Sequence, residues 1–412
     1  MKNRTMNQFD VIIVGGGIVG MAAACSLGAS GMTVAVVEAR APGADTGVRD
    51  ARVFAITRAS ERIFRALGAW DAISARDISA FREMRVWDAG GSGAIHFDCA
   101  DIGEPYLGHI IEPRFIQAAL LERLQALAGV QLYCPAQFRD IELDGDQVTV
   151  ALDDAATLTA RLVVAADGAR SPLRERLGIQ VREHDYRQSG LVALVKTEHG
   201  HRETAWQRFL PGGPLAFLPM SGGWSSIVWT LPSEEVTRLL ALDKEAFHAA
   251  LGEAFDFRLG RIIESEQRKT FPLRRLHATQ YIRKRAALIG DAAHTIHPLA
   301  GQGVNLGLLD AAALAEVLAD AQARGKDVGS VPVLRRYERW RRGENQLMMS
   351  AMDGFNLLFS NARPPLRWAR NLGLSMMDAA GPAKDVLMRH AMGLEGDLPA
   401  LARSPDAVPG TT

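Results

Sequence analysis

The chain has 412 residues, of which 48% are hydrophobic and 23% are charged, a composition typical of a globular protein of two or three domains. Its 47 Lys and Arg residues balance its 47 Asp and Glu residues, so the net charge gives no reason to expect a nucleic-acid partner. The three cysteines form no CxxC pair, which argues against a zinc site or a disulfide framework and favours a reducing cytoplasm. The polar N-terminus is unlike a signal peptide and no apolar run reaches about 18 residues, so we expect no membrane span.

The first 40 residues predict a βαβ unit. Residues 9–14 form an apolar, β-branched run, which is typical of a buried parallel strand. Residues 18–30 predict a helix that Gly31 ends, and residues 32–38 predict a second strand. The length of the whole unit, about 30 residues, is the usual one.

The remaining chain alternates strand and helix patterns, apart from one stretch. Residues 138–152 predict a β-hairpin that turns at Asp144-Gly145-Asp146. Residues 181–272 carry short strand patterns at 191–195, 215–219 and 226–231 and one helix pattern at 233–255, which indicates a separate, largely β domain. Further strands are expected at residues 161–166 and 286–289, and further helices at residues 60–67, 113–128, 305–324 and 331–394, the last interrupted at Pro364-Pro365 and Gly381-Pro382.

A GxGxxG motif stands between the first predicted strand and the first predicted helix. Gly15 permits a tight turn, Gly17 lets the backbone approach a pyrophosphate, and Gly20 lets the helix and strand pack closely. The helix beginning at Ile18 presents free N–H groups and a positive dipole end to the phosphates. Glu38, 18 residues past Gly20, can accept hydrogen bonds from a ribose diol. These residues predict a dinucleotide site but do not separate NAD from FAD.

Two later stretches distinguish the two cofactors. Asp167-Gly168-Ala169-Arg170-Ser171 follows one predicted strand, and Gly290-Asp291-Ala292-Ala293-His294 follows another and continues through Pro298, Gly301-Gln302-Gly303, Asn305, Gly307 and Asp310. Together with the glycine motif, these stretches resemble the flavoprotein aromatic hydroxylases built like para-hydroxybenzoate hydroxylase, and among them the ubiquinone-biosynthesis hydroxylases. Residues 52–56, 206–214, 335–345 and 355–359 support the resemblance, which covers about residues 8–394.

The resemblance implies an α/β fold, with a Rossmann-like FAD-binding domain, an inserted, mostly antiparallel β-sheet substrate domain and a helical C-terminal tail. We expect the FAD-binding domain at residues 1–75, 111–180 and 273–330, and the substrate domain at 76–110 and 181–272. The helical region is expected at residues 331–395, and disorder at 396–412.

The resemblance also implies FAD as the cofactor and NADH or NADPH as the co-substrate. Asp291 is expected to hold a ribityl hydroxyl, and the N–H groups of Val304 and Asn305, at the start of a helix, to stabilise negative charge on the flavin. The other expected cofactor residues are Arg52, Arg114, Asp167, Gly290, Gly301 and Gly303. No second GxGxxG is present, so the nicotinamide is expected to dock transiently.

The implied chemistry is transfer of one oxygen atom from a flavin C4a-hydroperoxide to an electron-rich ring, so O₂ is a second substrate. His297 is the candidate acid/base residue and Pro298 is expected to shape the wall beside the reacting oxygen, whereas His294 is expected to form a structural hydrogen bond beside Asp291. Phe217, Leu218 and Pro219 are the expected substrate-facing residues, with plain core packing as the alternative.

A basic cluster near the C-terminus consists of Arg335, Arg336, Arg339, Arg341 and Arg342, and apolar residues follow it at helical spacing from Leu347 to Phe359. Such a helix suits peripheral contact with an anionic inner membrane or with other ubiquinone-biosynthesis proteins. The alternative is a helix packed on the FAD domain with its arginines in solvent.

Three functions follow from these patterns. The leading one is hydroxylation of a polyprenylated phenol on the way to ubiquinone. The others are hydroxylation of a small soluble aromatic acid and a flavin-stabilised scaffold without catalysis. A charged anchor deep in the substrate domain would favour the small acid.

Overall fold

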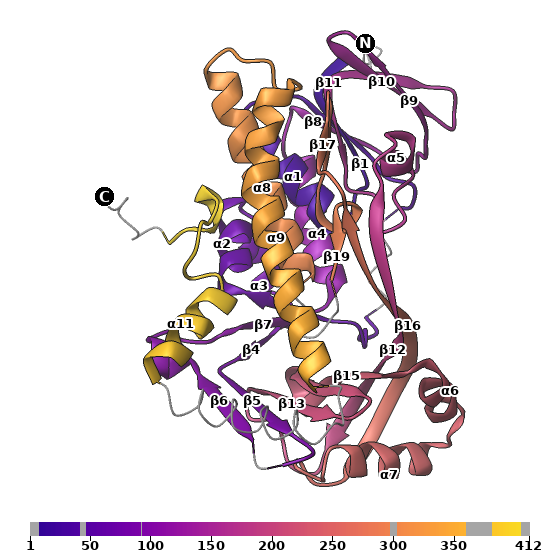
Figure 1. Cartoon of the computed structure of the whole chain (residues 1–412), viewed down its shortest axis with the longest axis vertical. Helices are drawn as coiled ribbons and strands as arrows, with labels where there is room; N and C mark the ends of the chain where they lie inside the picture. The colour runs from indigo at the N-terminus through magenta and orange to yellow at the C-terminus, as the bar shows by residue number, and fades with distance from the viewer. Residues whose placement is uncertain (1–7, 42–46, 92, 297–302, 360–380, 405–412) are drawn as a thin grey trace.

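The computed structural model describes residues 8–41, 47–91, 93–296, 303–359 and 381–404. Two large sheets and one small sheet organise these residues (Figure 1). None of the described helices is both long enough and apolar enough to cross a bilayer.

The first sheet is the parallel sheet that the sequence predicts. Its strand order is β17-β18-β11-β1-β2-β8, and neighbouring strands from β18 to β8 run parallel. The apolar runs are buried, and Val11, Ile12 and Ile13 of β1 have no exposed surface, as expected for strands covered on both faces. The strands are β1 (Gln8–Val14), β2 (Val34–Val37), β8 (Val130–Tyr133), β11 (Thr157–Ala165), β17 (Ile282–Arg283) and β18 (Ala286–Leu288), and the predicted hairpin β9 (Phe138–Asp144) and β10 (Gln147–Leu152) continues from β11.

Helices pack on this sheet and share its core. α1 ends where expected, because Gly31 adopts a φ of +85° that other residues rarely take. The helices are α1 (Ile18–Ala29), α2 (Arg58–Ala66), α3 (Trp70–Ser74), α4 (Pro113–Gln125), α5 (Pro172–Arg176) and α8 (Gly303–Ala323).

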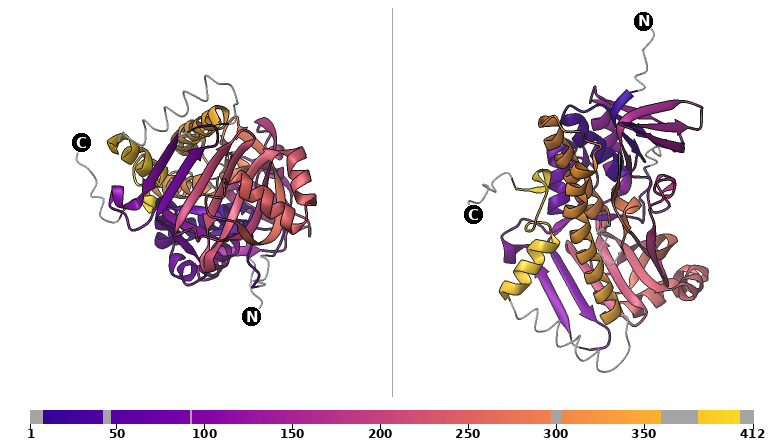
Figure 2. Two further views of the ribbon diagram at one scale, coloured as in Figure 1. Left: turned by 90° about the horizontal axis from the view of Figure 1, so that it is seen from below. Right: turned by 45° about the horizontal axis from the view of Figure 1, so that its top comes forward.

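The second sheet is antiparallel except where β13 joins β5, and it lies at the other end of the molecule (Figures 1 and 2). The three short strands predicted here lie inside longer ones, and β12 (Val181–Thr197) and β16 (Ile262–Ala278) each span 17 residues. The strand order is β19 (His294–Thr295), β16, β12, β15 (Trp224–Pro232), β14 (Gly213–Pro219), β13 (Thr204–Leu210), β5 (Glu83–Asp88) and β6 (Ala94–Asp98).

The single helix predicted at residues 233–255 is wrong, because two helices form there. Leu242 has extended backbone angles and separates α6 (Ser233–Ala241) from α7 (Lys244–Ala254). Asp243 then caps α7 by accepting a hydrogen bond from the Ala246 N–H at 2.8 Å. Both helices pack on one face of the second sheet in an apolar cluster with Phe217 and Phe255.

The third sheet and the C-terminal helices complete the fold. The small sheet has the order β3 (Phe54–Thr57), β7 (Gly108–Ile111) and β4 (Ser79–Phe81). Helix α9 (Val331–Phe359) runs along α8 towards the second sheet (Figure 1). Gly381-Pro382, one of the two predicted interruptions, is where α11 (Gly381–Ala391) begins, and the other, Pro364-Pro365, lies outside the described residues. The short 3₁₀ helices are η1 (Cys99–Ile102), η2 (Ser221–Gly223), η3 (Gly290–Ala292) and η4 (Ala400–Ala402).

The start of the tail expected to be disordered is structured. Ala402 of η4 is fully buried, the Ala400 N–H donates to Glu316 Oε2 at 2.7 Å, and the Trp340 Nε1–H donates to the Asp397 carbonyl at 3.0 Å. Backbone groups of this segment of polar and small residues form hydrogen bonds with side chains of α8 and α9. Composition alone could not predict these contacts. Residues 405–412 lie outside the described part.

Candidate active site

The glycine motif forms a tight junction between β1, α1 and the end of β11. Gly15 has a φ of +108°, and a Cβ atom there would lie 2.3 Å from the Ala166 carbonyl oxygen. A Cβ at Gly20 would lie 1.9 Å from the Gly15 carbonyl oxygen. A Cβ at Gly17 would meet nothing within 4 Å. The first two glycines are therefore required by packing, whereas Gly17 borders open space at the start of α1, where Ile18 begins the helix.

Glu38 supports this turn. Its Oε2 accepts a hydrogen bond from the Gly16 N–H at 2.7 Å, and its Oε1 accepts one from the Arg40 N–H at 2.9 Å. Each carboxylate oxygen has a second lone pair, so a ribose hydroxyl remains an available partner. Its role towards a ribose stays a prediction.

Asp167 follows β11 and carries an unsatisfied acceptor. Its Oδ2 accepts from the Leu173 N–H at 3.1 Å, while its buried Oδ1 has no hydrogen-bond partner among the described residues. Burial raises the pKa of the Asp167 carboxyl. The hydrogen bonds from Ser171 and Leu173 lower this pKa, but the effect of burial is larger. A buried polar atom without a partner is uncommon, so this oxygen fits a donor on a bound molecule.

The turn after β18 brings a second carboxylate to the same edge. β1, β11 and β18 are adjacent and parallel, so their carboxyl ends place Gly15, Asp167 and Gly290 along one edge of the sheet. The Asp291 side chain keeps access to solvent. Desolvation by the surrounding protein raises the pKa of the Asp291 carboxyl, and the charges of His294 and Arg52 oppose this rise.

The start of α8 faces the same turn. Gly303 is its first residue, so Val304 and Asn305 lie in the first turn, whose N–H groups have no acceptor within the helix. The Asn305 side chain is buried and tied to β3 and α2: its Oδ1 accepts from the Ser60 Oγ–H at 2.7 Å, and its Nδ2–H donates to the Ala55 carbonyl at 2.8 Å. The side chain therefore anchors the helix, and only the backbone N–H is available to a ligand.

The two predicted arginines differ in surroundings. Arg52 is exposed, lies 5.6 Å from the Phe54 ring centroid and acts electrostatically on Asp291. Arg114 is the second residue of α4, and its Nε–H donates to Glu112 Oε2 at 2.7 Å. Arg52 thus lies near the Asp291 turn, whereas a role for Arg114 towards a cofactor remains a prediction. His297, Pro298 and Gly301 lie outside the described residues.

The three substrate-facing candidates on β14 point to different environments. Phe217 is fully buried and stacks on Phe255 with 3.9 Å between ring centroids, so it packs in the core beneath α6 and α7 and does not line a site. Leu218 points to the opposite face, into an apolar cluster with residues of β3, β7 and β12. Pro219 is buried at the end of the strand.

The sequence missed the partner of His294 and the surroundings of Arg341. His294 is buried and forms a structural hydrogen bond as expected, but its Nε2 lies 2.5 Å from Asp310 Oδ2, and Asp310 had no assigned role. Arg341, counted in the basic cluster, is 2% exposed and its Nε–H donates to Asp310 Oδ1 at 3.0 Å. The spacing of Tyr337, Arg341 and Asn345 could have placed Arg341 on the buried face of α9.

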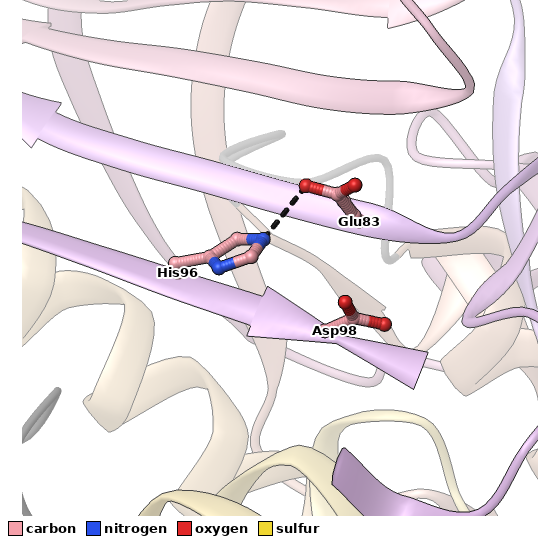
Figure 3. Close-up of side chains that lie close together, drawn as sticks. All are labelled: Glu83, His96 and Asp98. Atoms are coloured by element: carbon pink, nitrogen blue, oxygen red, sulfur yellow. Dashed lines mark hydrogen bonds and ion pairs between the residues drawn. The ribbon is translucent and has the colours of Figure 1, made fainter. Parts of the chain in front are cut away.

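One group of possible metal ligands occurs among the described residues, on β5 and β6 (Figure 3). His96 Nε2 lies 2.7 Å from Glu83 Oε2, and the Arg85 Nη2–H donates to the same oxygen at 2.9 Å. The Asp98 Oδ1 accepts from the Ala100 N–H at 2.9 Å. These partly exposed side chains already have partners, and the group is an ion-pair cluster.

Comparison with known proteins agrees with this geometry. A family model described as "FAD binding domain" matches residues 8–351. The ubiquinone hydroxylase UbiL of Rhodospirillum rubrum is 42% identical over 93% of this chain and 89% of its own. The 3-demethoxyubiquinol 3-hydroxylase of Escherichia coli is 39% identical over 95% of this chain and 100% of its own. The mitochondrial ubiquinone biosynthesis monooxygenase COQ6 of Homo sapiens is 35% identical over 94% of this chain and 93% of its own.

Solved structures share the fold. The p-nitrophenol 4-monooxygenase of Pseudomonas putida superposes with a TM-score of 0.75 over 94% of this chain and 97% of its own, at 23% identity. A probable FAD-dependent monooxygenase of Pseudomonas aeruginosa superposes with a TM-score of 0.74 over 89% of this chain and 99% of its own, at 26% identity. The chain therefore belongs to the FAD-binding family of aromatic-ring monooxygenases and, within it, to the ubiquinone-biosynthesis hydroxylases.

Proposed function

We propose that this enzyme uses NAD(P)H and O₂ to hydroxylate the ring of a polyprenylated phenol in ubiquinone biosynthesis. The observation that carries the proposal is the alignment of the Gly15 turn, Asp167 and Asp291 along the carboxyl edge of three adjacent parallel strands. A cofactor with a nucleotide at one end and a flat ring at the other can extend along this edge and reach all three positions. The names of the three relatives, each a hydroxylase or monooxygenase of ubiquinone or its biosynthesis, support the choice of substrate.

The residues present fit FAD. Gly17 and the first turn of α1 would receive the pyrophosphate, Glu38 a ribose, and Asp291 a hydroxyl of the ribityl chain. The first turn of α8 would place the N–H groups of Val304 and Asn305 towards the flavin, where they stabilise negative charge. Bound FAD supplies the redox chemistry, since reduced flavin activates O₂ for transfer to a ring.

The part of the second sheet that residues 181–272 form favours an uncharged substrate. Residues 181–272 are all described, and their buried polar side chains are Thr197, Thr204, Gln207, Ser225, Ser226 and Thr230. None of these carries a charge, and a buried arginine or lysine would be the expected partner for a carboxylate. Leu218 and its neighbours form an apolar layer on this face. A phenol with an apolar tail suits that layer better than a small aromatic acid does.

The function is tested by profiling quinones with mass spectrometry in a strain that lacks this protein. We expect a prenylated precursor without one ring hydroxyl to accumulate, and its mass names the missing hydroxylation. Unchanged ubiquinone with an accumulated small aromatic acid would favour the alternative substrate. If purified protein neither oxidises NAD(P)H nor forms product, the result would support the hypothesis of a flavin-stabilised scaffold without catalysis.

Removal of the Asp291 carboxylate is expected to weaken FAD binding. A hydrogen bond to a charged group contributes about 1.5–3 kcal/mol, so Asp291→Ala should raise the Kd for FAD roughly 10- to 100-fold. The Kd is measured by quenching of flavin fluorescence on titration with apoprotein. Asp154→Ala, which removes an exposed carboxylate from the β10–β11 turn, is the control and should leave the Kd unchanged. Equal Kd values for both variants would contradict the role of Asp291.

We further propose that the outer face of α9 makes peripheral contact with an anionic membrane. Arg335, Arg336 and Arg339 are exposed there, and Leu347 on the same helix is 64% exposed. Because Arg336 pairs with Asp320, the contact depends mainly on Arg335 and Arg339. Flotation with anionic vesicles at low salt should recover the protein, and Arg335→Glu with Arg339→Glu should reduce recovery. No flotation of the unaltered protein would reject membrane contact and leave docking to another biosynthetic protein as the use of this face.

A further inference from the structure

Asp310 of α8 is a completely buried carboxylate at the back of the flavin-binding turn. It has no exposed surface, and its two oxygens accept hydrogen bonds from two separate parts of the chain. Oδ2 accepts from the Gly290 N–H at 3.1 Å and from His294 Nε2 at 2.5 Å. Oδ1 accepts from the Arg341 Nε–H and from the Asn345 Nδ2–H, both at 3.0 Å. An ionised carboxylate offers about four lone-pair sites, and all are used.

The two pairs of donors have different origins. Gly290 and His294 belong to the turn that carries Asp291, whereas Arg341 and Asn345 belong to α9. The Arg341 Nη2–H also donates to Asn345 Oδ1 at 3.0 Å, so the donors from α9 hold each other in place. Asp310 therefore connects one face of α9 to the turn beside the expected flavin.

The charges in this network are balanced. An isolated carboxylate is costly to bury, and Arg341 supplies the opposite charge while being 2% exposed itself. Burial raises the pKa of the Asp310 carboxyl, but His294, Arg341 and Asn345 outweigh burial and hold the pKa at about 2. Asp310 therefore remains ionised at neutral pH. Because Asp310 Oδ2 lies within hydrogen-bond distance of His294 Nε2, this ring nitrogen carries a proton.

Close packing holds the turn from the other side. A Cβ atom at Gly307, one helical turn before Asp310, would lie 2.6 Å from Val19 Cγ2 and 3.2 Å from the Gly290 Cα. Further along α9, Met349 packs against Ile296 and Leu306. The turn is thus packed between α1, α8 and α9. Because this packing leaves little free space, a small shift of Asp310 would also move the turn.

We propose that Asp310, paired with Arg341 and Asn345 of α9, is a positioning residue that sets how Asp291 and the first turn of α8 face the flavin. The inference rests on the FAD placement proposed above and not on the identity of the aromatic substrate. α9 thereby takes part in cofactor binding without touching the cofactor.

The chain offers a matched pair for the test. Asp320 and Arg336 also join α8 to α9, ten and five residues from Asp310 and Arg341 along the sequence, but their side chains are 27% and 44% exposed. The test variants are Asp310→Asn and Arg341→Met, and the controls are Asp320→Asn and Arg336→Met. The Kd for FAD and the absorption spectrum of the bound flavin are measured, together with the thermal midpoints of the apo and FAD-loaded proteins.

Loss of a residue that orients a metal ligand typically weakens metal binding about 10- to 100-fold, and an effect of this order is expected for a residue that orients a cofactor-binding group. We expect this increase in the Kd for FAD, with an altered flavin spectrum, for Asp310→Asn and Arg341→Met, and less than about a twofold change for the controls. A role confined to stability would lower both thermal midpoints equally and leave the Kd and the spectrum as in the controls, which would overturn the proposal. FAD titration needs no aromatic substrate, so an error in the proposed substrate does not affect the result.

A milder variant covers the case in which these proteins do not fold. Asn345→Ala removes one donor to Asp310 Oδ1 but keeps the Arg341 pair. We expect a smaller increase in the Kd in the same direction. An unchanged Kd and spectrum for Asn345→Ala, with a lowered thermal midpoint, would also overturn the positioning role.

Discussion

Replacing Gly20 with alanine is expected to yield a protein that purifies without FAD. The new Cβ would lie 1.9 Å from the Gly15 carbonyl oxygen and 3.2 Å from the Ala166 Cβ. The first of these is a backbone atom beside a strand, so no side-chain rotation relieves the overlap. Overpacking of this kind costs typically about 1–3 kcal/mol and occasionally more. The helix must move away from β1, and its first turn then no longer faces the pyrophosphate.

The ratio of flavin to protein absorbance after purification measures this outcome. Gly343→Ala is the control, because it also adds one methyl group to a helical glycine but meets no atom within 4 Å. That variant should keep its flavin and gain up to about 1 kcal/mol of stability, since alanine favours a helix more than glycine does. A Gly20→Ala protein with a full complement of FAD would show that the close approach of α1 to β1 is dispensable.

Local patterns were sufficient to predict the nucleotide-binding half of the fold. The apolar run of β1, the helix that ends at Gly31 and the second strand all occur, with ends shifted by one or two residues. These elements depend on burial and on turns, which short stretches of sequence encode directly. The two later motifs also indicated FAD, because together with the glycine motif they resemble the flavoprotein aromatic hydroxylases.

Features that depend on contacts between distant residues were not predictable in the same way. An arginine in a basic run is usually solvated, and the buried position of Arg341 is favourable because Asp310 and Asn345 accept its hydrogen bonds. Likewise, alternation along β14 did not reveal which face meets α6 and α7, so Phe217 was grouped with Leu218 and Pro219 as a substrate-facing candidate although it packs beneath these helices. The break at Leu242 was missed because the apolar spacing continues across it.

Lowering the pH is expected to destabilise the protein in part through Glu61, and Glu61→Gln should reduce the loss of stability on acidification. The Glu61 side chain is 3% exposed and pairs with Arg58 Nη1 and Arg65 Nη2, both at 2.8 Å. It also accepts from the Tyr106 O–H at 2.9 Å. Burial alone would raise the pKa of Glu61, but His109, Arg58, Arg65 and Tyr106 outweigh burial and lower the pKa to about 2 from 4.5.

The sign of the effect follows from this lowered pKa. A group whose pKa is lower in the folded state contributes stability above its unfolded pKa and loses it as the pH falls towards the folded value. For Glu61 the loss occurs between about pH 4.5 and pH 2. The contribution at neutral pH is about 2 kcal/mol, allowing for solvent screening of the half-exposed Arg65. Glu61→Gln should be less stable by about this amount at pH 7 and should lose less stability on acidification.

Urea unfolding at several pH values between 7 and 3 measures both effects. Glu235→Gln is the matched control, because Glu235 also pairs with an arginine three residues away, Arg238, but both side chains are about half exposed. An exposed pair contributes roughly 0–1 kcal/mol, so this variant should follow the pH dependence of the unaltered protein. If Glu61→Gln also follows it, the carboxylate is not held ionised by its neighbours, and the acid sensitivity belongs to other groups such as Asp310, whose pKa is also lowered to about 2.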